Sequence, residues 1–164
     1  MAPREGLSRD RLIVGLTGAS GIAYGVKLLE LLRALPVETH LVMSRAAEVT
    51  LAYESDLKVA QVKALAGVVH ANDDMAAPIS SGSFRTLGMV VAPCSVKTLA
   101  EIATGVTGSL LARAADVVLK ERRRLVLMLR ETPLTTGHIR NMLAVRRSEE
   151  RRVGEGCRSR WSPY

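Results

Sequence analysis

Two short segments combine glycine, hydroxyl and other small residues where an apolar run passes into a helical pattern. One is 17–21 (TGASG), after the apolar run 12–16, and the other is 93–98 (PCSVKT), after the apolar run 87–92. Glycine lets the backbone approach a ligand closely, and the amide N–H groups at a helix N-terminus favour an anion. The hydroxyls of Thr17 and Ser20 can add donors. Both segments therefore indicate a polar site that favours an anion, with a tight strand-to-helix turn as the alternative for the first.

These segments exclude some chemistry. TGASG is not the G-x-G-x-x-G fingerprint of dinucleotide binding, and no acidic residue closes the second expected strand, 37–43, where NAD would need one for its ribose. Cys94 could be a nucleophile, but no histidine or acid lies beside it in the sequence to activate it. A small buried thiol is the favoured interpretation of Cys94.

A polar loop and a basic cluster are further candidates. The loop 78–84 (PISSGSF) could cover a ligand or simply turn the chain, and the sequence leaves both open. Arg113, Lys120 and residues 122–124 are basic, and charges spaced along a helix usually form its solvated face. The pair 130–131 (Arg-Glu) differs because it follows the apolar strand 125–129 directly, where a charge needs a partner or a ligand. We therefore favour a functional role for this pair.

The elements that must position these residues alternate between strand and helix. Strands are expected at 12–16, 37–43, 87–92 and 125–129, and helices at 22–35, 45–53, 59–66, 98–103 and 110–120. Ser44 is a plausible N-cap for 45–53, and a last helical segment follows Thr135 and Thr136 through about Leu143. Such alternation predicts βαβ units and a mostly parallel, doubly wound sheet. Ligands then bind at the carboxyl ends of the strands.

The composition fits one globular domain without a membrane span. The chain has 164 residues, of which 48% are hydrophobic, 3% aromatic and 24% charged. No apolar run approaches the roughly 18 residues that a span needs, the N-terminus lacks a secretory signal, and two cysteines predict a cytoplasmic protein. Residues 146–164 hold six Arg and three Glu, which is +3 of the net +7 and leaves +4 for the rest. Nucleic-acid binding is not expected.

Five sequence blocks resemble successive blocks of the UbiX-type flavin prenyltransferases, from about Arg11 to Met142. They are RLIVGLTGASGIAYGVKLLELL, ETHLVMSRAA, ISSGSFRTLGMVVAPCSVKTLAEIATG, LLARAADVVLKERRRLVLMLRETPL and GHIRNM. The resemblance implies a Rossmann/flavodoxin-like three-layer α/β domain, assembled as a homo-oligomer with FMN at subunit interfaces. It implies transfer of a dimethylallyl group from dimethylallyl phosphate to reduced FMN, which closes a fourth ring. The product would be the prenylated-FMN cofactor of UbiD-type decarboxylases, in ubiquinone biosynthesis among other pathways. No metal is implied.

The resemblance also implies roles for particular residues. FMN contacts would fall on Gly18, Ala19, Ser20, Ser44, Ser95, Val96, Lys97, Thr98 and Arg130. The catalytic set would be Ser20, Glu54, Lys120, Arg130 and Glu131, and the substrate phosphate would lie near Arg113 and Lys120. These cations can stabilise the charge that grows on a leaving phosphate. Glu131 could relay a proton, and Glu54 and Ser20 match positions near the reacting flavin edge.

The resemblance stops after Met142, where the family continues with a strand, a loop bearing a tyrosine and a C-terminal helix with a lysine. We expect a disordered N-terminus at 1–10, an FMN-binding domain at 11–145 that is incomplete at its C-terminus, and a non-native or disordered basic tail at 146–164. The tail is interpreted as translated adapter sequence, so Cys157, Trp161 and Tyr164 receive no role. The alternatives are an FMN-binding but inactive fragment and a related flavin-dependent cysteine decarboxylase.

Overall fold

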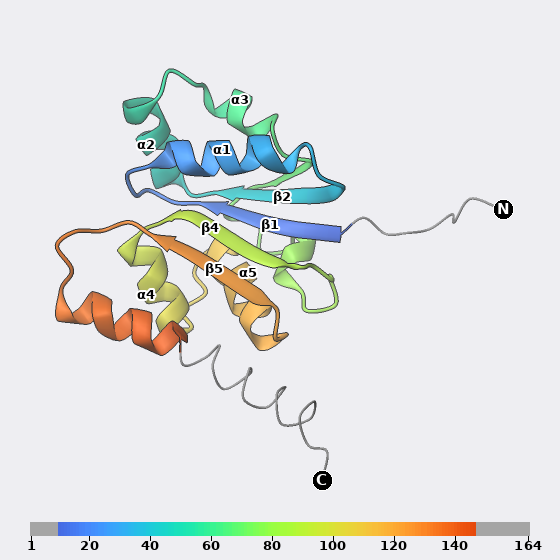
Figure 1. The fold of residues 1–164 in the computed structure, drawn as a ribbon. Coiled ribbons are helices and arrows are strands. Elements are labelled where there is room, and N and C mark those ends of the chain that lie inside the picture. The colour runs from blue at the N-terminus through green and yellow to red at the C-terminus, as the bar shows by residue number, and fades with distance from the viewer. Residues whose placement is uncertain (1–9, 147–164) are drawn as a thin grey trace, which may run out of the picture.

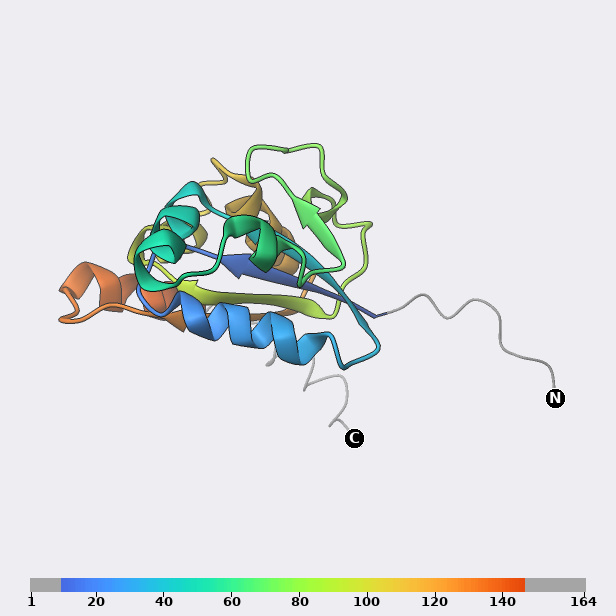
Figure 2. The same cartoon turned by 90° about the horizontal axis from the view of Figure 1, so that it is seen from above.

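A parallel β-sheet with helices on both faces forms the domain (Figures 1 and 2). The computed structural model describes residues 10–146. The strands are β1 (Asp10–Leu16), β2 (Val37–Met43), β3 (Val68–His70), β4 (Gly88–Cys94) and β5 (Arg124–Leu129), in the order β3-β2-β1-β4-β5. The helices are α1 (Ile22–Leu32), α2 (Arg45–Glu54), α3 (Val59–Lys63), the 3-10 helix η1 (Pro78–Ser80), α4 (Val96–Thr104) and α5 (Leu110–Lys120). The expected three-layer α/β domain is confirmed.

Successive residues of the central strands point to opposite faces, and each face has its own hydrophobic core. Val14 and Leu16 of β1 pack with α1, α2 and α3 on one face. Ile13 of β1 packs with α4 and α5 on the other face. Burial on both faces explains why β1 and β4 are almost continuously apolar. A search for alternating apolar and polar residues would not have identified these strands.

The strand order places a switch point between β1 and β4. The chain moves from β1 outward to β2 and β3, and then returns across β1 to form β4 and β5. All strand pairs are parallel, with Val14 opposite Leu41 of β2 and Val90 of β4. Loops that follow β1 and β4 therefore diverge to opposite faces at the carboxyl edge, which is where open α/β sheets bind ligands.

Several element boundaries differ from those predicted. The first helix ends at Leu32 rather than residue 35, because residues 33–36 form turns before β2. The helix predicted at 98–103 begins at Val96, since the Ser95 side chain caps it. The stretch predicted as helix at 59–66 is helical only over Val59–Lys63. The strand β3 and the helix η1 were not predicted, because three residues are too few to show a periodicity.

The first strand and the last helical segment each reach one residue beyond the expected limits, 11 and 145, of the FMN-binding domain. Asp10 belongs to β1, one residue before the expected start of the domain, and the last helical segment spans 136–146. The interpretations of residues 1–9 and 147–164, including Cys157, Trp161 and Tyr164, lie outside the described residues. Among the described residues, no helix combines the length and the apolar character that crossing a membrane requires.

A chain of polar contacts links the first three strands on the α5 face. Buried His40 contacts Glu38 through Nε2 at 2.8 Å and His70 through Nδ1 at 3.0 Å. Arg11 donates to the same Glu38 oxygen at 3.2 Å and lies over the ring of Phe84. If both histidines were protonated, two hydrogens would face each other between the rings. The cluster therefore accommodates only one proton between the two facing nitrogens.

This cluster predicts acid sensitivity of the fold. Burial, and then the charge of His40, lowers the pKa of His70, with Asp74 opposing. The unfolded chain therefore binds more protons than the folded chain as the pH falls below about 6.5, and stability is lost in that direction. We expect the melting temperature to fall by a few degrees between about pH 7.5 and about pH 5.5. His70→Gln should flatten this dependence in thermal unfolding experiments, and an equally steep dependence in the variant would contradict the assignment.

Candidate functional site

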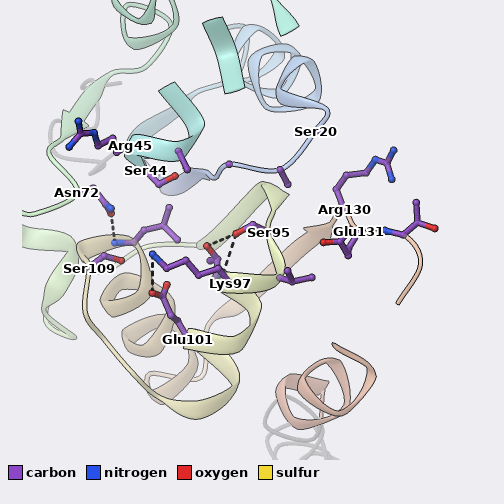
Figure 3. Close-up of a pocket in the computed structure, with 17 residues that line it drawn as sticks. Ser20, Ser44, Arg45, Asn72, Ser95, Lys97, Glu101, Ser109, Arg130 and Glu131 are labelled. Atoms are coloured by element: carbon purple, nitrogen blue, oxygen red, sulfur yellow. Dashed lines mark hydrogen bonds and ion pairs between the residues drawn. The ribbon is translucent and has the colours of Figure 1, made fainter. Parts of the chain in front are cut away.

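A pocket of about 660 Å³ opens at the carboxyl edge of the sheet (Figure 3). Its walls come from the residues that follow each of the five strands and from the start of α5. The lining residues are Gly18, Ala19, Ser20, Ser44, Arg45, Ala46, Asn72, Ser95, Val96, Lys97, Thr98, Glu101, Ser109, Leu111, Arg130, Glu131 and Thr132. Its volume is in the range of small-molecule and cofactor sites.

Three helices begin at this pocket with a serine as their N-cap. Ser44 accepts the amide N–H of Ala47 at the start of α2, and Ser95 accepts that of Thr98 at the start of α4. Ser109 does the same for α5. The N-terminus of a helix carries partial positive charge, so three such ends at one pocket favour an anionic ligand.

The four nearby helix starts differ in which amides remain for a ligand. At α1, Gly21 and Ile22 donate to Oε2 of Glu54 at 2.9 and 3.1 Å. At α5, the amides of residues 110 and 111 donate to the main chain and side chain of Asn72 at 2.8 and 3.1 Å. The first two amides of α2 and of α4 have no hydrogen-bond partner among residues 10–146. The gap between the starts of α2 and α4 is therefore the best position for a phosphate.

Gly18 allows the first loop to lie against the start of α2. A Cβ atom at this position would lie 2.3 Å from Cβ of Ala46, which is too close for any larger residue. Gly21 adopts a φ of 93° just before α1, a conformation that favours glycine. The two glycines of the TGASG segment are thus required for different reasons. Gly18 allows a close approach to α2, and Gly21 adopts a left-handed backbone conformation.

Glu54 ties the end of α2 to the first loop. The amide hydrogen bonds from Gly21 and then Ile22 lower the pKa of Glu54, and a hydrogen bond from Ser20 and the charge of Arg130 act in the same direction. Glu54 is therefore an ionised acceptor at neutral pH, and it lies beside Ser20 rather than in the pocket wall. The structure thus brings together Ser20, Glu54 and Arg130, three of the predicted catalytic residues.

Arg130 and Glu131 lie at the carboxyl end of β5 and both line the pocket, at one side of the view in Figure 3. The amide of Arg130 donates to the carbonyl of Cys94 at 3.0 Å, which holds this segment against the end of β4.

Cys94 itself is completely buried, and burial raises the pKa of its thiol to about 12. The structure supports the interpretation of Cys94 as a buried thiol and not a nucleophile.

Arg113 and Lys120 do not reach this pocket in the same chain. Arg113 donates to the carbonyl of Ser80 at 3.2 Å and pairs with Asp116 at 2.9 Å. Lys120 pairs with Glu121 at the far end of α5, about 15 Å along the helix from its first residue. The predicted catalytic residue Lys120 is thus separated from Ser20, Glu54 and Arg130 within one chain.

The loop 78–84 lies with these basic residues and does not line the pocket. Arg123 donates to the carbonyls of Phe84 and Gly82, both at 2.6 Å, and Ile79 is buried in the core. Within one chain the loop therefore packs against α5 and the start of β5, and it does not cover the pocket. This loop forms a second polar surface together with Arg113 and Lys120, on a side of the domain away from the pocket.

Thr17 corrects the expectation that its hydroxyl donates to a ligand. It is buried and its hydrogen bonds are made within the protein.

The sequence also missed seven residues that line the pocket: Arg45, Ala46, Asn72, Glu101, Ser109, Leu111 and Thr132. Ser109 could have been found as the N-cap of the helix predicted at 110–120. Asn72 lies in an irregular loop whose sequence gives no such signal.

Comparisons with known proteins identify the family to which this chain is similar. The Flavoprotein family model matches residues 2–147. A probable UbiX-like flavin prenyltransferase of Streptomyces sp. (strain D7) is 63% identical over 138 residues, which cover 84% of this chain and 69% of that protein. The crystal structure of AnUbiX (PadA1) with FMN and dimethylallyl pyrophosphate has a TM-score of 0.85 and 58% identity, covering 86% of this chain and 75% of that one.

A second solved structure adds an assembly. It is a dodecameric FMN-dependent UbiX-like decarboxylase from Escherichia coli O157:H7, with a TM-score of 0.83 and 57% identity, covering 84% of this chain and 76% of that one. The family model spans all the residues that line the pocket, and the sequence identity to this structure is far above the level at which only a fold is shared. The chain therefore belongs to the Flavoprotein family and, within it, to the UbiX-type flavin prenyltransferases.

Proposed function

We propose that this chain binds FMN in the pocket at the carboxyl edge of the sheet and transfers a dimethylallyl group from dimethylallyl phosphate to reduced FMN. One observation carries the proposal. All nine residues for which the sequence implied an FMN contact lie around this single pocket, although they come from four separate segments of the chain. Two helix starts, whose first amides have no hydrogen-bond partner within residues 10–146, supply the anion site that a flavin phosphate needs.

The residues present fit the cofactor. The amides at the starts of α2 and α4, together with the Ser44 and Ser95 hydroxyls, would hold the phosphate. The loop 18–20 and Arg130 would lie along the remainder of the molecule. When bound and reduced, FMN supplies the nucleophilic ring and a flat face beside which the allyl group can react.

Breaking the allylic C–O bond leaves negative charge on the departing phosphate, and forming the new bond to the flavin releases a proton. Arg130 can stabilise the phosphate charge as it develops, because its cation is already in place at the pocket wall. Glu131, next to it in the wall, can accept and return a proton. Glu54 holds the first loop through Gly21 and Ile22 and fixes Ser20 beside the pocket.

The complete site would form between copies of the chain. Arg113, Lys120 and the loop 78–84 carry the predicted phosphate-binding groups, but they lie on another side of the domain. A homo-oligomer in which this surface of one copy faces the pocket of another would unite them. The dodecameric assembly of the similar E. coli protein supports this arrangement. We further propose a cytoplasmic enzyme whose product is passed to a UbiD-type decarboxylase.

Anaerobic incubation of the full chain with reduced FMN and dimethylallyl phosphate tests the proposal. We expect FMN to bind and a prenylated flavin to appear in mass spectra, with dimethylallyl pyrophosphate as a parallel donor. Glu54→Gln combined with Glu131→Gln should retain FMN binding but lose most of the turnover. FMN binding without product would favour the binding-only fragment, and release of carbon dioxide from a cysteinyl peptide would favour the decarboxylase alternative. A folded chain that does not bind FMN would contradict the proposal.

A further inference from the structure

Thr17 joins the ends of the two central strands at the switch point. Its side chain is only 1% exposed. Its hydroxyl donates to the carbonyl of Pro93 at 2.7 Å and accepts the amide N–H of Ser95 at 2.8 Å. The main-chain amide of Thr17 also donates to the Pro93 carbonyl, at 3.3 Å. The hydroxyl therefore both donates and accepts a hydrogen bond within the protein.

These contacts continue the sheet beyond the point where regular pairing stops. The last paired residues of β1 and β4 are Gly15 and Val91. Pro93 has no amide hydrogen to donate, so a ladder cannot continue normally past it. The Thr17 hydroxyl supplies a donor and an acceptor at this place instead, and it fixes the segment 93–95 against the end of β1.

Ser95 connects Thr17 with the first turn of α4. While its amide is held by Thr17, its side-chain oxygen accepts the amide of Thr98 at 3.2 Å and its carbonyl accepts that of Leu99 at 2.9 Å. The amides of Val96 and Lys97, which have no hydrogen-bond partner in the part of the chain that the structure describes, lie within the same turn. Their position relative to the loop 18–20 therefore depends on the hydroxyl of Thr17, which is not itself part of the pocket wall.

We propose that Thr17 is a positioning residue that sets the anion-binding turn of α4 for the flavin phosphate, an inference that rests on the proposed function. Valine at this position would keep the shape of the side chain but leave the Ser95 amide without its partner, and the Pro93 carbonyl would keep only the longer hydrogen bond from the main-chain amide of residue 17. A partly buried amide that loses its partner is unfavourable, so the segment 93–98 would move until the amide is satisfied. Serine would retain the hydroxyl and cysteine would provide only a weak substitute.

The test compares Thr17→Val, Thr17→Cys and Thr17→Ser in the full chain. FMN dissociation constants are measured by quenching of flavin fluorescence, and exchange of the Ser95 amide hydrogen is measured without FMN. We expect Thr17→Val to weaken FMN binding by about tenfold or more and to accelerate Ser95 exchange, with Thr17→Cys intermediate. Thr17→Ser should remain within about threefold of the natural protein.

Two controls separate positioning from a general loss of stability. Thr104→Val removes a hydroxyl that donates to the Ala100 carbonyl at the other end of α4, and FMN affinity should not change. Val62→Ala removes buried apolar contacts in α3 and should lower stability without lowering FMN affinity.

Several results would overturn the inference. One is a folded Thr17→Val variant that binds FMN as tightly as the natural protein. If Thr17→Val does not fold, the same result in Thr17→Cys would overturn the inference. An affinity in Thr17→Ser as low as in Thr17→Val would also reject the role of the hydroxyl. If the natural chain itself did not bind FMN, the proposed function would be contradicted. The role of Thr17 would then still be rejected if the Ser95 amide exchanged at the same rate in the variants as in the natural chain.

Discussion

Replacing Gly25 with alanine should destabilise the domain strongly, although alanine is the better helix former. Gly25 is buried where α1 crosses β4, and a Cβ atom there would lie 2.2 Å from the carbonyl oxygen of Ala92 and 2.2 Å from Cδ2 of Leu16. The end of the Leu16 side chain can shift, but the Ala92 carbonyl belongs to a central strand. The whole of α1 would have to move away from the sheet, separating it from the apolar residues that it covers.

The expected change in the free energy of unfolding is opposite in sign to the change that helix propensity alone would give. The test therefore separates the two effects. Propensity alone would give Gly25→Ala a gain of about 1 kcal/mol, whereas the overlap should lower the free energy of unfolding by about 3 kcal/mol or more. Urea denaturation followed by circular dichroism measures this free energy. FMN binding should also weaken, because α1 begins directly after the loop 18–21 of the pocket.

Gly108→Ala provides the matched control for this substitution. A Cβ atom at Gly108 would meet nothing within 4 Å, and its φ does not lie in the left-handed region. We expect the free energy of unfolding to change by no more than about 0.5 kcal/mol. If Gly25→Ala proved as stable as Gly108→Ala, α1 would not lie against Ala92 in the way that the structure shows.

The location of the pocket followed from the sequence because parallel strands place their carboxyl ends at one edge. The segments 17–21, 93–98 and 130–131 were each predicted as polar segments that follow an apolar run, and residues from all three line the pocket at the carboxyl edge. The prediction needed only the alternation of strands and helices together with the residue types after each strand. The N-caps Ser44 and Ser95 then set where α2 and α4 begin.

The sequence could not assign hydrogen bonds that depend on the approach of distant segments. A threonine in a glycine-rich loop is equally compatible with a ligand contact and with the internal bonds that Thr17 makes to a segment 76 and 78 residues away. Asn72 was missed for the same reason, since its partner, the start of α5, is 39 residues away in the chain. The distance of Lys120 from the pocket follows from the direction of α5, which carries its last residue away from the carboxyl edge.

Lys97→Glu should have the largest effect on ligand binding while leaving the fold intact. Lys97 lines the pocket at the second position of α4, and its side chain is 84% exposed, with Glu101 at 3.8 Å as its partner. A carboxylate in the first turn favours the helix by an amount similar to the repulsion it would feel from Glu101. The free energy of unfolding should therefore change little. A flavin phosphate at the start of α4 would instead face a negative charge where a positive one lay.

We expect Lys97→Glu to weaken FMN binding by about 100-fold, since reversing one charge within about 4 to 6 Å of a phosphate changes the interaction by a few kcal/mol. Flavin fluorescence quenching measures the affinity, and the loss should shrink as salt is added because the charges are partly exposed. Riboflavin lacks the phosphate and should bind the variant and the natural protein almost equally. Lys27→Glu, which reverses an exposed charge on α1 outside the pocket, should leave FMN affinity unchanged. An equal loss of riboflavin and FMN would place the phosphate elsewhere than between α2 and α4.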